Sequence, residues 1–84
     1  MVELDDWRRN GQEEYLRGAH LQYKVFELGF PGYDHDHCSF CFQKITCLDI
    51  PDGQKSGYAT SDNQHWVCSH CFADFKEEFE WHLD

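Results

Sequence analysis

Basic side chains and long apolar runs are what this sequence has least of. Lys and Arg number 7 against 16 Asp and Glu, which gives a formal net charge of −9 at pH 7. Proteins that bind nucleic acids use Lys and Arg to displace counterions from phosphates, so this balance disfavours a nucleic-acid partner. No run of apolar residues approaches the roughly 20 that cross a bilayer, so we expect no membrane association either.

The first residues also lack the features of a secretory signal. Residues 1–6 are acidic and mixed in polarity, whereas a signal peptide has a basic start followed by an apolar stretch. We therefore expect a complete, untagged cytoplasmic protein that begins at Met1. The 5 cysteines fit a reducing cytosol, because an odd number is awkward for a disulfide scaffold and suits four metal-binding thiolates with one spare thiol.

A chain of 84 residues has room for a single domain, which we expect over residues 1–84. A domain of this size buries only roughly 60% of the surface that its unfolded chain exposes, so its stability margin is thin. A bound metal often makes up such a deficit in small domains. The aromatic content of 17% supplies large apolar area to pack around it.

Two Cys-x-x-Cys pairs, Cys38 with Cys41 and Cys68 with Cys71, are the most specific pattern in the sequence. A two-residue spacer lets one tight turn aim two thiolates at a single point, and two such turns complete the tetrahedral shell that zinc prefers. We therefore predict one structural Zn²⁺ bound by these four side chains. Two redox-active dithiols or four buried cysteines are the alternatives, and iron is the alternative metal.

Cys47 lies outside both pairs and is expected to be a small buried residue, with a spare ligand or a reactive thiol as the other interpretations.

The C-terminal part of the chain predicts an amphipathic helix preceded by a hairpin. Residues 72–82 place three aromatic side chains on one helical face, and Ser69 suits the N-cap position. Residues 58–60 and 65–67 flank a run of polar residues, which is typical of a β-hairpin with a four-residue turn. The aromatic residues of the helical face are Phe72, Phe75 and Phe79.

The N-terminal part is less regular. Residues 4–9 predict a short helix that ends at Asn10 and Gly11. Residues 12–18 are ambiguous between a turn of helix and a strand. Alternating apolar residues predict a strand over residues 21–28, followed by a turn at residues 30–33.

The first cysteine pair sits in a knuckle-like run, His37-Cys38-Ser39-Phe40-Cys41-Phe42-Gln43-Lys44. The second pair falls at the end of the expected hairpin and the start of the expected helix. In this order of elements and ligands the sequence resembles the treble-clef zinc fingers. The resemblance covers about residues 37–82. It implies a small zinc-stabilised α+β domain with a zinc knuckle, a β-hairpin and a C-terminal helix. Residues 37–84 would form the zinc-binding unit, and residues 1–36 a helix and strand extension packed on it. Treble clefs serve in binding modules, ribosomal proteins and nucleases alike, so the resemblance does not decide the function.

The run Asp34-His35-Asp36-His37 resembles a stretch of some treble-clef His-Me (HNH-type) endonucleases, in which a His activates water near a magnesium ion. In those enzymes the stretch follows the first cysteine pair, whereas here it precedes that pair, and the expected helix offers only His82 to complete the site. We therefore expect no nuclease activity. The same residues could instead bind a second metal through His35, His37 and a carboxylate, hydrogen-bond the knuckle, or form a solvated turn.

Several other side chains near the cysteines have competing roles. His70 could replace a cysteine as ligand, although the two cysteines beside it are the better-spaced pair. Phe40, Phe42 and Trp66 are expected in the core, where they would shield the metal. Trp81 lies off the aromatic face of the helix, so it either packs back on the N-terminal segment or forms part of an exposed contact.

No paired nucleophile and base, phosphate-binding loop or open metal site is visible in the sequence, so we predict that the protein is not an enzyme. Its acidity favours a protein partner with a basic surface, which electrostatic steering would bring on faster. An inhibitor or immunity-type protein that covers a basic nuclease is one form of such a module, and solubility alone is another explanation of the charge. A nucleic-acid-binding zinc finger and a metal-dependent nuclease are the rival functions. The acidic residues expected at the interface, beside Trp81, are Asp74, Glu77, Glu78, Glu80 and Asp84.

Overall fold

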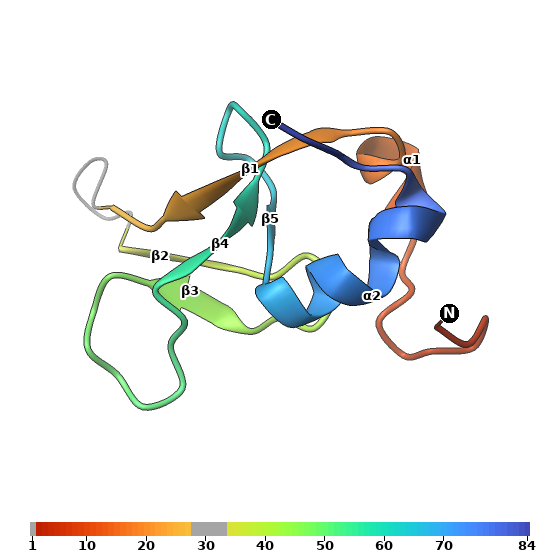
Figure 1. Ribbon diagram of the computed structural model, residues 1–84. Helices are drawn as coiled ribbons and strands as arrows, with labels where there is room; N and C mark the ends of the chain where they lie inside the picture. Colours follow the sequence, from red (N-terminus) through yellow and green to blue (C-terminus); the bar gives the residue numbers. More distant parts are fainter. Residues whose placement is uncertain (1, 28–33) are drawn as a thin grey trace.

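The computed structural model describes residues 2–27 and 34–84, which form two helices and six strands (Figure 1). The fold is therefore of the predicted α+β class. The turn predicted at residues 30–33 and the Leu28 end of the predicted strand lie outside the described residues. In chain order the elements are α1 (Glu13–Leu16), β1 (His20–Val25), β2 (His35–His37), β3 (Lys44–Thr46), β4 (Ser56–Ala59), β5 (Trp66–Val67), α2 (Ser69–Phe79) and β6 (His82–Leu83).

One strand from the N-terminal part of the chain, β1, completes the main sheet. The strand order of this sheet is β5-β4-β1-β6, with β1 antiparallel to β4 and parallel to the C-terminal strand β6. A second sheet pairs β2 with β3 in antiparallel register. Because β1 lies between two strands from the second half of the sequence, the N-terminal part shares one hydrogen-bonded sheet with the part that carries the cysteines.

The predicted hairpin is confirmed. Strands β4 and β5 are antiparallel, and the N–H of Thr60 donates to the carbonyl of His65 at 3.1 Å across the connecting turn. Strand β1 overlaps the predicted segment 21–28 but begins at His20 and ends at Val25. The ambiguous residues 12–18 contain a helix, α1, rather than a strand.

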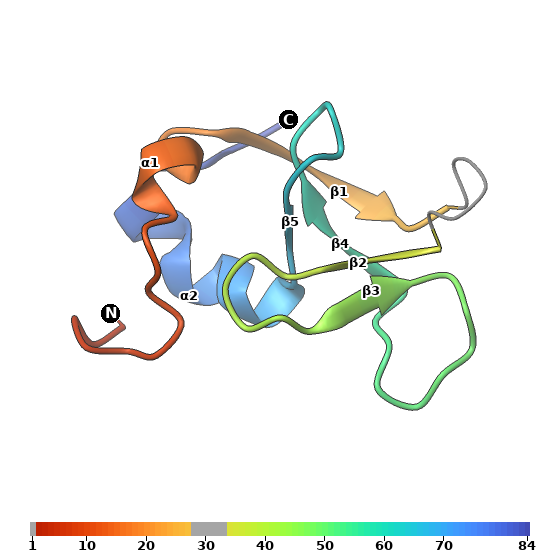
Figure 2. The ribbon, with the colours of Figure 1, turned by 180° about the vertical axis from the view of Figure 1, so that it is seen from behind.

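The predicted helix over residues 4–9 is wrong. This segment makes only isolated turns, in which the N–H of Asp6 donates to the Glu3 carbonyl at 3.1 Å and the N–H of Arg9 to the Asp6 carbonyl at 3.0 Å. The Asp6 carboxylate accepts the backbone N–H of Arg8 at 2.9 Å, and such a local side-chain bond competes with helix formation. Residues 2–12, which we call the N-terminal arm, therefore run as an irregular segment beside α2 (Figure 2).

Helix α2 begins at the second cysteine pair. Cys68 is its N-cap in place of the predicted Ser69, and the Cys68 sulfur accepts the backbone N–H of Cys71 at 3.5 Å. Neither described helix is long and apolar enough to cross a bilayer. The predicted aromatic face of α2 is confirmed, because all three of its members are buried: Phe72, Phe75 and Phe79.

The end of α2 differs from the prediction and closes the core. The helix ends at Phe79, because Glu80 adopts a left-handed conformation with φ of 54° and its N–H returns to carbonyls of the last helical turn. His82, predicted to be helical, instead begins β6. Between them Trp81 is buried, and its indole N–H donates to the Leu16 carbonyl at 2.8 Å. The packing of Trp81 on the N-terminal segment is confirmed, and the alternative of an exposed contact is wrong.

Stacked aromatic rings form the main core. Phe40 from the knuckle stacks on Phe75 of α2 with 4.4 Å between ring centroids, and Trp81 meets the Phe40 ring edge-on. Trp66 is buried in a second cluster, so Phe40 and Trp66 lie in the core as predicted. Phe42 is 61% exposed, contrary to the prediction, because the chain reverses there with a φ of 64° and the ring points away from the core.

The Trp81 hydrogen bond predicts a measurable contribution to stability. Trp81→Phe keeps an aromatic ring but removes the N–H that binds the Leu16 carbonyl, so it should lower the free energy of unfolding by about 1–2 kcal/mol. Trp7→Phe is the matched control, because Trp7 is 69% exposed and its replacement should change stability by less than about 0.5 kcal/mol. Urea unfolding followed by far-UV circular dichroism measures both, and equal midpoints for the two variants would contradict the prediction.

Candidate metal centre

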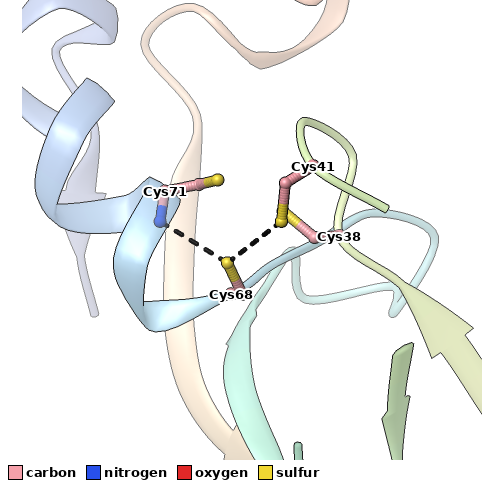
Figure 3. A group of neighbouring side chains, drawn as sticks. All are labelled: Cys38, Cys41, Cys68 and Cys71. Atoms are coloured by element: carbon pink, nitrogen blue, oxygen red, sulfur yellow. Dashed lines mark hydrogen bonds between the residues drawn. The ribbon is translucent and has the colours of Figure 1, made fainter. Parts of the chain in front are cut away.

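Four cysteine side chains converge between the knuckle and the start of α2 (Figure 3). Their sulfurs all lie within 4.8 Å of one another, and those of Cys41 and Cys68 are 3.6 Å apart. Across residues 2–27 and 34–84, this is the only group of three or more metal-ligating side chains close enough to share an ion. The structure thus brings together all four residues that the spacing singles out, Cys38, Cys41, Cys68 and Cys71, in a group that could hold a metal ion.

Backbone hydrogen bonds shape each turn so that its thiols face the same point. In the knuckle, the N–H of Phe42 donates to the Cys38 carbonyl at 3.0 Å, and the N–H of Phe40 donates to the Cys38 sulfur at 3.4 Å. At the start of α2, the N–H of Cys71 donates to the Cys68 sulfur at 3.5 Å. Such N–H donors stabilise a thiolate, so both turns favour the form of cysteine that binds metals.

A junction between two backbone segments helps to hold the two turns side by side. The carbonyl of Trp66, in β5, accepts the N–H of Ser39 at 2.8 Å, and Trp66 forms an isolated bridge with Cys38. Ser39 lies inside the first cysteine pair, and Trp66 precedes Cys68 by two residues. This junction therefore sets the knuckle directly beside the start of α2.

The electrostatics of the group favour a cation among the sulfurs. The pKa of Cys38 is lowered, because the thiols of Cys68 and Cys71 donate hydrogen bonds to its sulfur. The pKa of Cys68 is raised to about 11 and that of Cys71 is also raised, because these thiols donate their protons to Cys38 and burial adds to the effect. One thiolate forms readily while further ones repel it, and a divalent cation would remove that repulsion.

Arg8 belongs to the site although no sequence motif predicts it. Its Nη1 donates to the Cys71 sulfur at 3.4 Å and to Asp74 Oδ2 at 2.9 Å, and its Nε donates to the Asp6 carboxylate at 2.9 Å. The side chain is 10% exposed, and the pKa of the guanidinium is raised, chiefly by the bond to Asp6. Arg8 is 63 residues from Cys71, so spacing holds no signal for this contact. The one hint is chemical, because four thiolates carry surplus negative charge that a nearby cation offsets.

Gln12 fixes the N-terminal arm against the knuckle. Its side chain is buried, and its Oε1 accepts the N–H of Asn10 at 2.6 Å. Its Nε2 donates to the carbonyls of Arg8 at 2.6 Å and Ser39 at 3.1 Å. A buried amide with three hydrogen bonds therefore joins the arm to the turn that carries the first cysteine pair.

The histidines do not join the group. His35 and His37 lie on β2 with their rings edge-on at 5.0 Å, and His35 Nδ1 is 2.6 Å from an oxygen of the Asp34 carboxylate. Within the part of the chain that the structure describes, no set of three ligands close enough to share an ion forms around them. His70 is exposed on α2, with its Nε2 3.3 Å from Asp74 Oδ2, so the two cysteines and not His70 supply the second half of the group.

Cys47, the fifth cysteine, lies in the second core cluster rather than in the metal-binding group. It is half-buried and packs against the cluster that contains Trp66 and Ile45. The prediction of a small buried residue is therefore met only in part, because Cys47 packs against a core cluster but is not fully buried. It also makes Cys47 a control that has the same chemistry as the four converging cysteines but a different place in the fold.

Comparisons of the chain with protein-family models, with curated proteins and with solved structures find no match. The functional proposal therefore depends on the geometry of the chain itself. That geometry consists of four converging thiols, three of them in buried residues, with a guanidinium bonded to one sulfur. Such a group can hold a soft metal ion with four protein ligands, which leaves no tetrahedral position for water or substrate.

Proposed function

We propose that the four cysteines bind one structural Zn²⁺ and that the protein is a zinc-stabilised, treble-clef-like module for binding another protein. The observation that supports the metal is the convergence of four thiols. A tetrahedron with Zn–S bonds of about 2.3 Å places its sulfurs ~3.8 Å apart. The sulfurs of Cys41 and Cys68 are 3.6 Å apart and all four lie within 4.8 Å, so small side-chain rotations suffice to reach that spacing.

The role that fits this site is structural rather than catalytic. Catalytic zinc sites keep one position open for water or substrate, whereas four cysteine ligands fill the tetrahedron. Cys38, Cys68 and Cys71 are buried, and Phe40 and Phe72 pack in the same core. A metal enclosed in this way stabilises the fold and has no access to a substrate.

The order of the elements supports the treble-clef-like assignment. The knuckle with the first cysteine pair comes before the hairpin of β4 and β5, and α2 then supplies the second pair from its N-terminal end. The treble-clef resemblance implies the same order and the same placement of ligands. Strands β1 and β6 extend the hairpin into a four-stranded sheet.

Elemental analysis of the purified protein should return one zinc per chain. Cys68→Ser removes a ligand, so it should abolish cooperative folding, because metal binding and folding are coupled in such sites. Cys47→Ser also replaces a side-chain sulfur by oxygen, but outside the metal-binding group. This variant should retain one zinc per chain and a cooperative unfolding transition. Iron in place of zinc would correct the metal assignment, and a wild-type protein without metal would contradict the proposal.

The proposed partner surface on α2 is smaller than the acidic run of the sequence predicts. Asp74 and Glu78 form ion pairs with two arginines of the N-terminal arm, at 2.9 and 2.5 Å. Trp81 is buried, so it cannot act as the anchor of an interface. The carboxylates that remain exposed at the end of α2 are those of Glu77 and Glu80.

The N-terminal arm, which is docked on α2 through Arg8 and Arg9, carries exposed apolar side chains of its own. Leu4 is 87% and Trp7 69% exposed. A pocket of about 540 Å³ lies between the arm and α2, and carboxylates that include Glu3, Asp6 and Glu77 line it. Exposed apolar and aromatic residues on a strongly acidic protein support a protein partner with a basic surface, and the net charge of −9 disfavours a nucleic acid. An inhibitor that covers a basic protein is the form of binding that this charge fits best.

The double variant Glu77→Lys/Glu80→Lys should fold and bind zinc normally, because exposed substitutions usually change stability by less than about 0.5 kcal/mol. It should nevertheless associate more slowly with the native partner, since steering by these carboxylates is reversed. Affinity capture from cell lysate, followed by association kinetics with the recovered protein, measures the effect.

The control is Asp49→Lys/Asp52→Lys, which makes the same charge change at exposed residues of the loop between β3 and β4. Equal association rates for the wild type and both double variants would place the interface away from α2. Retention of labelled duplex DNA by the wild type at physiological salt would favour the nucleic-acid alternative instead.

A further inference from the structure

The N-terminal arm is attached to α2 by two neighbouring arginines, and Arg8 differs from Arg9 in its contact with a converging sulfur. Each pairs with a carboxylate of α2, Arg8 at 2.9 Å and Arg9 at 2.5 Å. Both guanidinium groups lie over the ring of Phe75, at 4.8 and 5.4 Å from its centroid. Arg8 also reaches one of the four converging sulfurs, that of Cys71, at 3.4 Å.

We propose that Arg8 is a positioning residue of the metal centre and that its hydrogen bond to Cys71 couples the docking of the N-terminal arm to metal binding. This inference rests on the proposed zinc site. It adds that the arm is part of that site, because a metal ligand is bonded to a side chain of the arm.

The physical basis of the coupling is the charge of the filled site. Four thiolates around a divalent cation carry a net charge of about −2, which is spread over the sulfurs. A guanidinium N–H directed at one of these sulfurs makes a charge-assisted hydrogen bond, which is stronger than its bond to a neutral thiol. The docked arm therefore favours the metal-bound form, and by linkage the metal-bound form favours the docked arm.

The structure holds the Arg8 side chain and backbone in place independently. The Asp6 carboxylate binds Nε and Nη2 of Arg8, which orients the guanidinium within the arm. The buried Gln12 amide joins the Arg8 carbonyl to that of Ser39, inside the first cysteine pair. The arm thus contacts the knuckle through Gln12 and the second cysteine pair through Arg8, so it spans both halves of the metal-binding group.

The test compares Arg8→Gln with Arg9→Gln in the zinc-loaded full chain. Competition with a chromophoric chelator measures zinc affinity, and amide hydrogen exchange measures docking of the arm. Arg8→Gln should weaken zinc affinity about 10-fold, as expected for loss of an outer-shell partner, while Arg9→Gln should change it by less than about 3-fold. Both variants should speed exchange in the arm, because each loses an ion pair with α2.

The protein loaded with Co²⁺ gives a readout that a loss of arm stability alone would not change. The sulfur-to-metal charge-transfer absorption depends on the hydrogen bonds that the sulfurs accept. It should shift in Arg8→Gln and stay unchanged in Arg9→Gln. Arg8→Lys keeps the positive charge but cannot bridge Cys71, Asp6 and Asp74 at once, so it should recover only part of the zinc affinity.

Unchanged zinc affinity in Arg8→Gln, or equal losses in both Gln variants, would overturn the coupling and leave the zinc site standing. If Arg8→Gln fails to fold, the same measurements on Arg8→Lys test the coupling. Wild-type affinity together with an unshifted charge-transfer band in Arg8→Lys would overturn the coupling. A wild-type chain that binds no zinc would overturn the proposed function and the coupling with it.

Discussion

The convergence of two cysteine turns is the constraint on which the rest of the fold depends. The knuckle and the start of α2 are far apart in the sequence, and the junction between Ser39 and Trp66 sets them side by side. Phe40 lies inside the first cysteine pair, and Phe75 lies one helical turn beyond the second. The approach that brings the sulfurs together therefore also stacks these two rings, at 4.4 Å between centroids. If the cysteines bind zinc as proposed, metal binding and formation of the aromatic core would be parts of one folding event, which suits a chain too small to rely on its core alone.

Both ends of the described chain wrap around this centre. The N-terminal arm contacts it through Arg8 and Gln12. At the other end the left-handed Glu80 turns the chain back, so that Trp81 binds the Leu16 carbonyl and β6 pairs with β1. Two of the five acidic residues among the last residues of the sequence, Asp74 and Glu78, are used inside the molecule in ion pairs with the arm. A partner would meet the carboxylates that these pairs leave exposed.

Sequence reasoning succeeded where the signal is local or chemically specific. The two-residue spacers identified all four converging cysteines, and the period of the aromatic residues identified the buried face of α2. It failed where a tertiary contact or a single side chain determines the local backbone structure. The Asp6 carboxylate turns residues 4–9 away from a helix, and the packing of Trp81 ends α2 at Phe79. The contact of Arg8 with Cys71 joins residues with no pattern between them, so only the structure reveals it. The treble-clef-like assignment and the basic protein partner remain proposals.

Near-UV circular dichroism during removal of the metal by a chelator tests most directly whether a metal ion holds the two cysteine turns together. The signal in this region comes from aromatic rings in fixed surroundings, which here include Phe40, Phe75 and Trp81 in the core beside the cysteines. We predict that the signal is lost in step with release of one zinc per chain and returns when zinc is added back. A metal-depleted protein with an unchanged near-UV spectrum would contradict the claim.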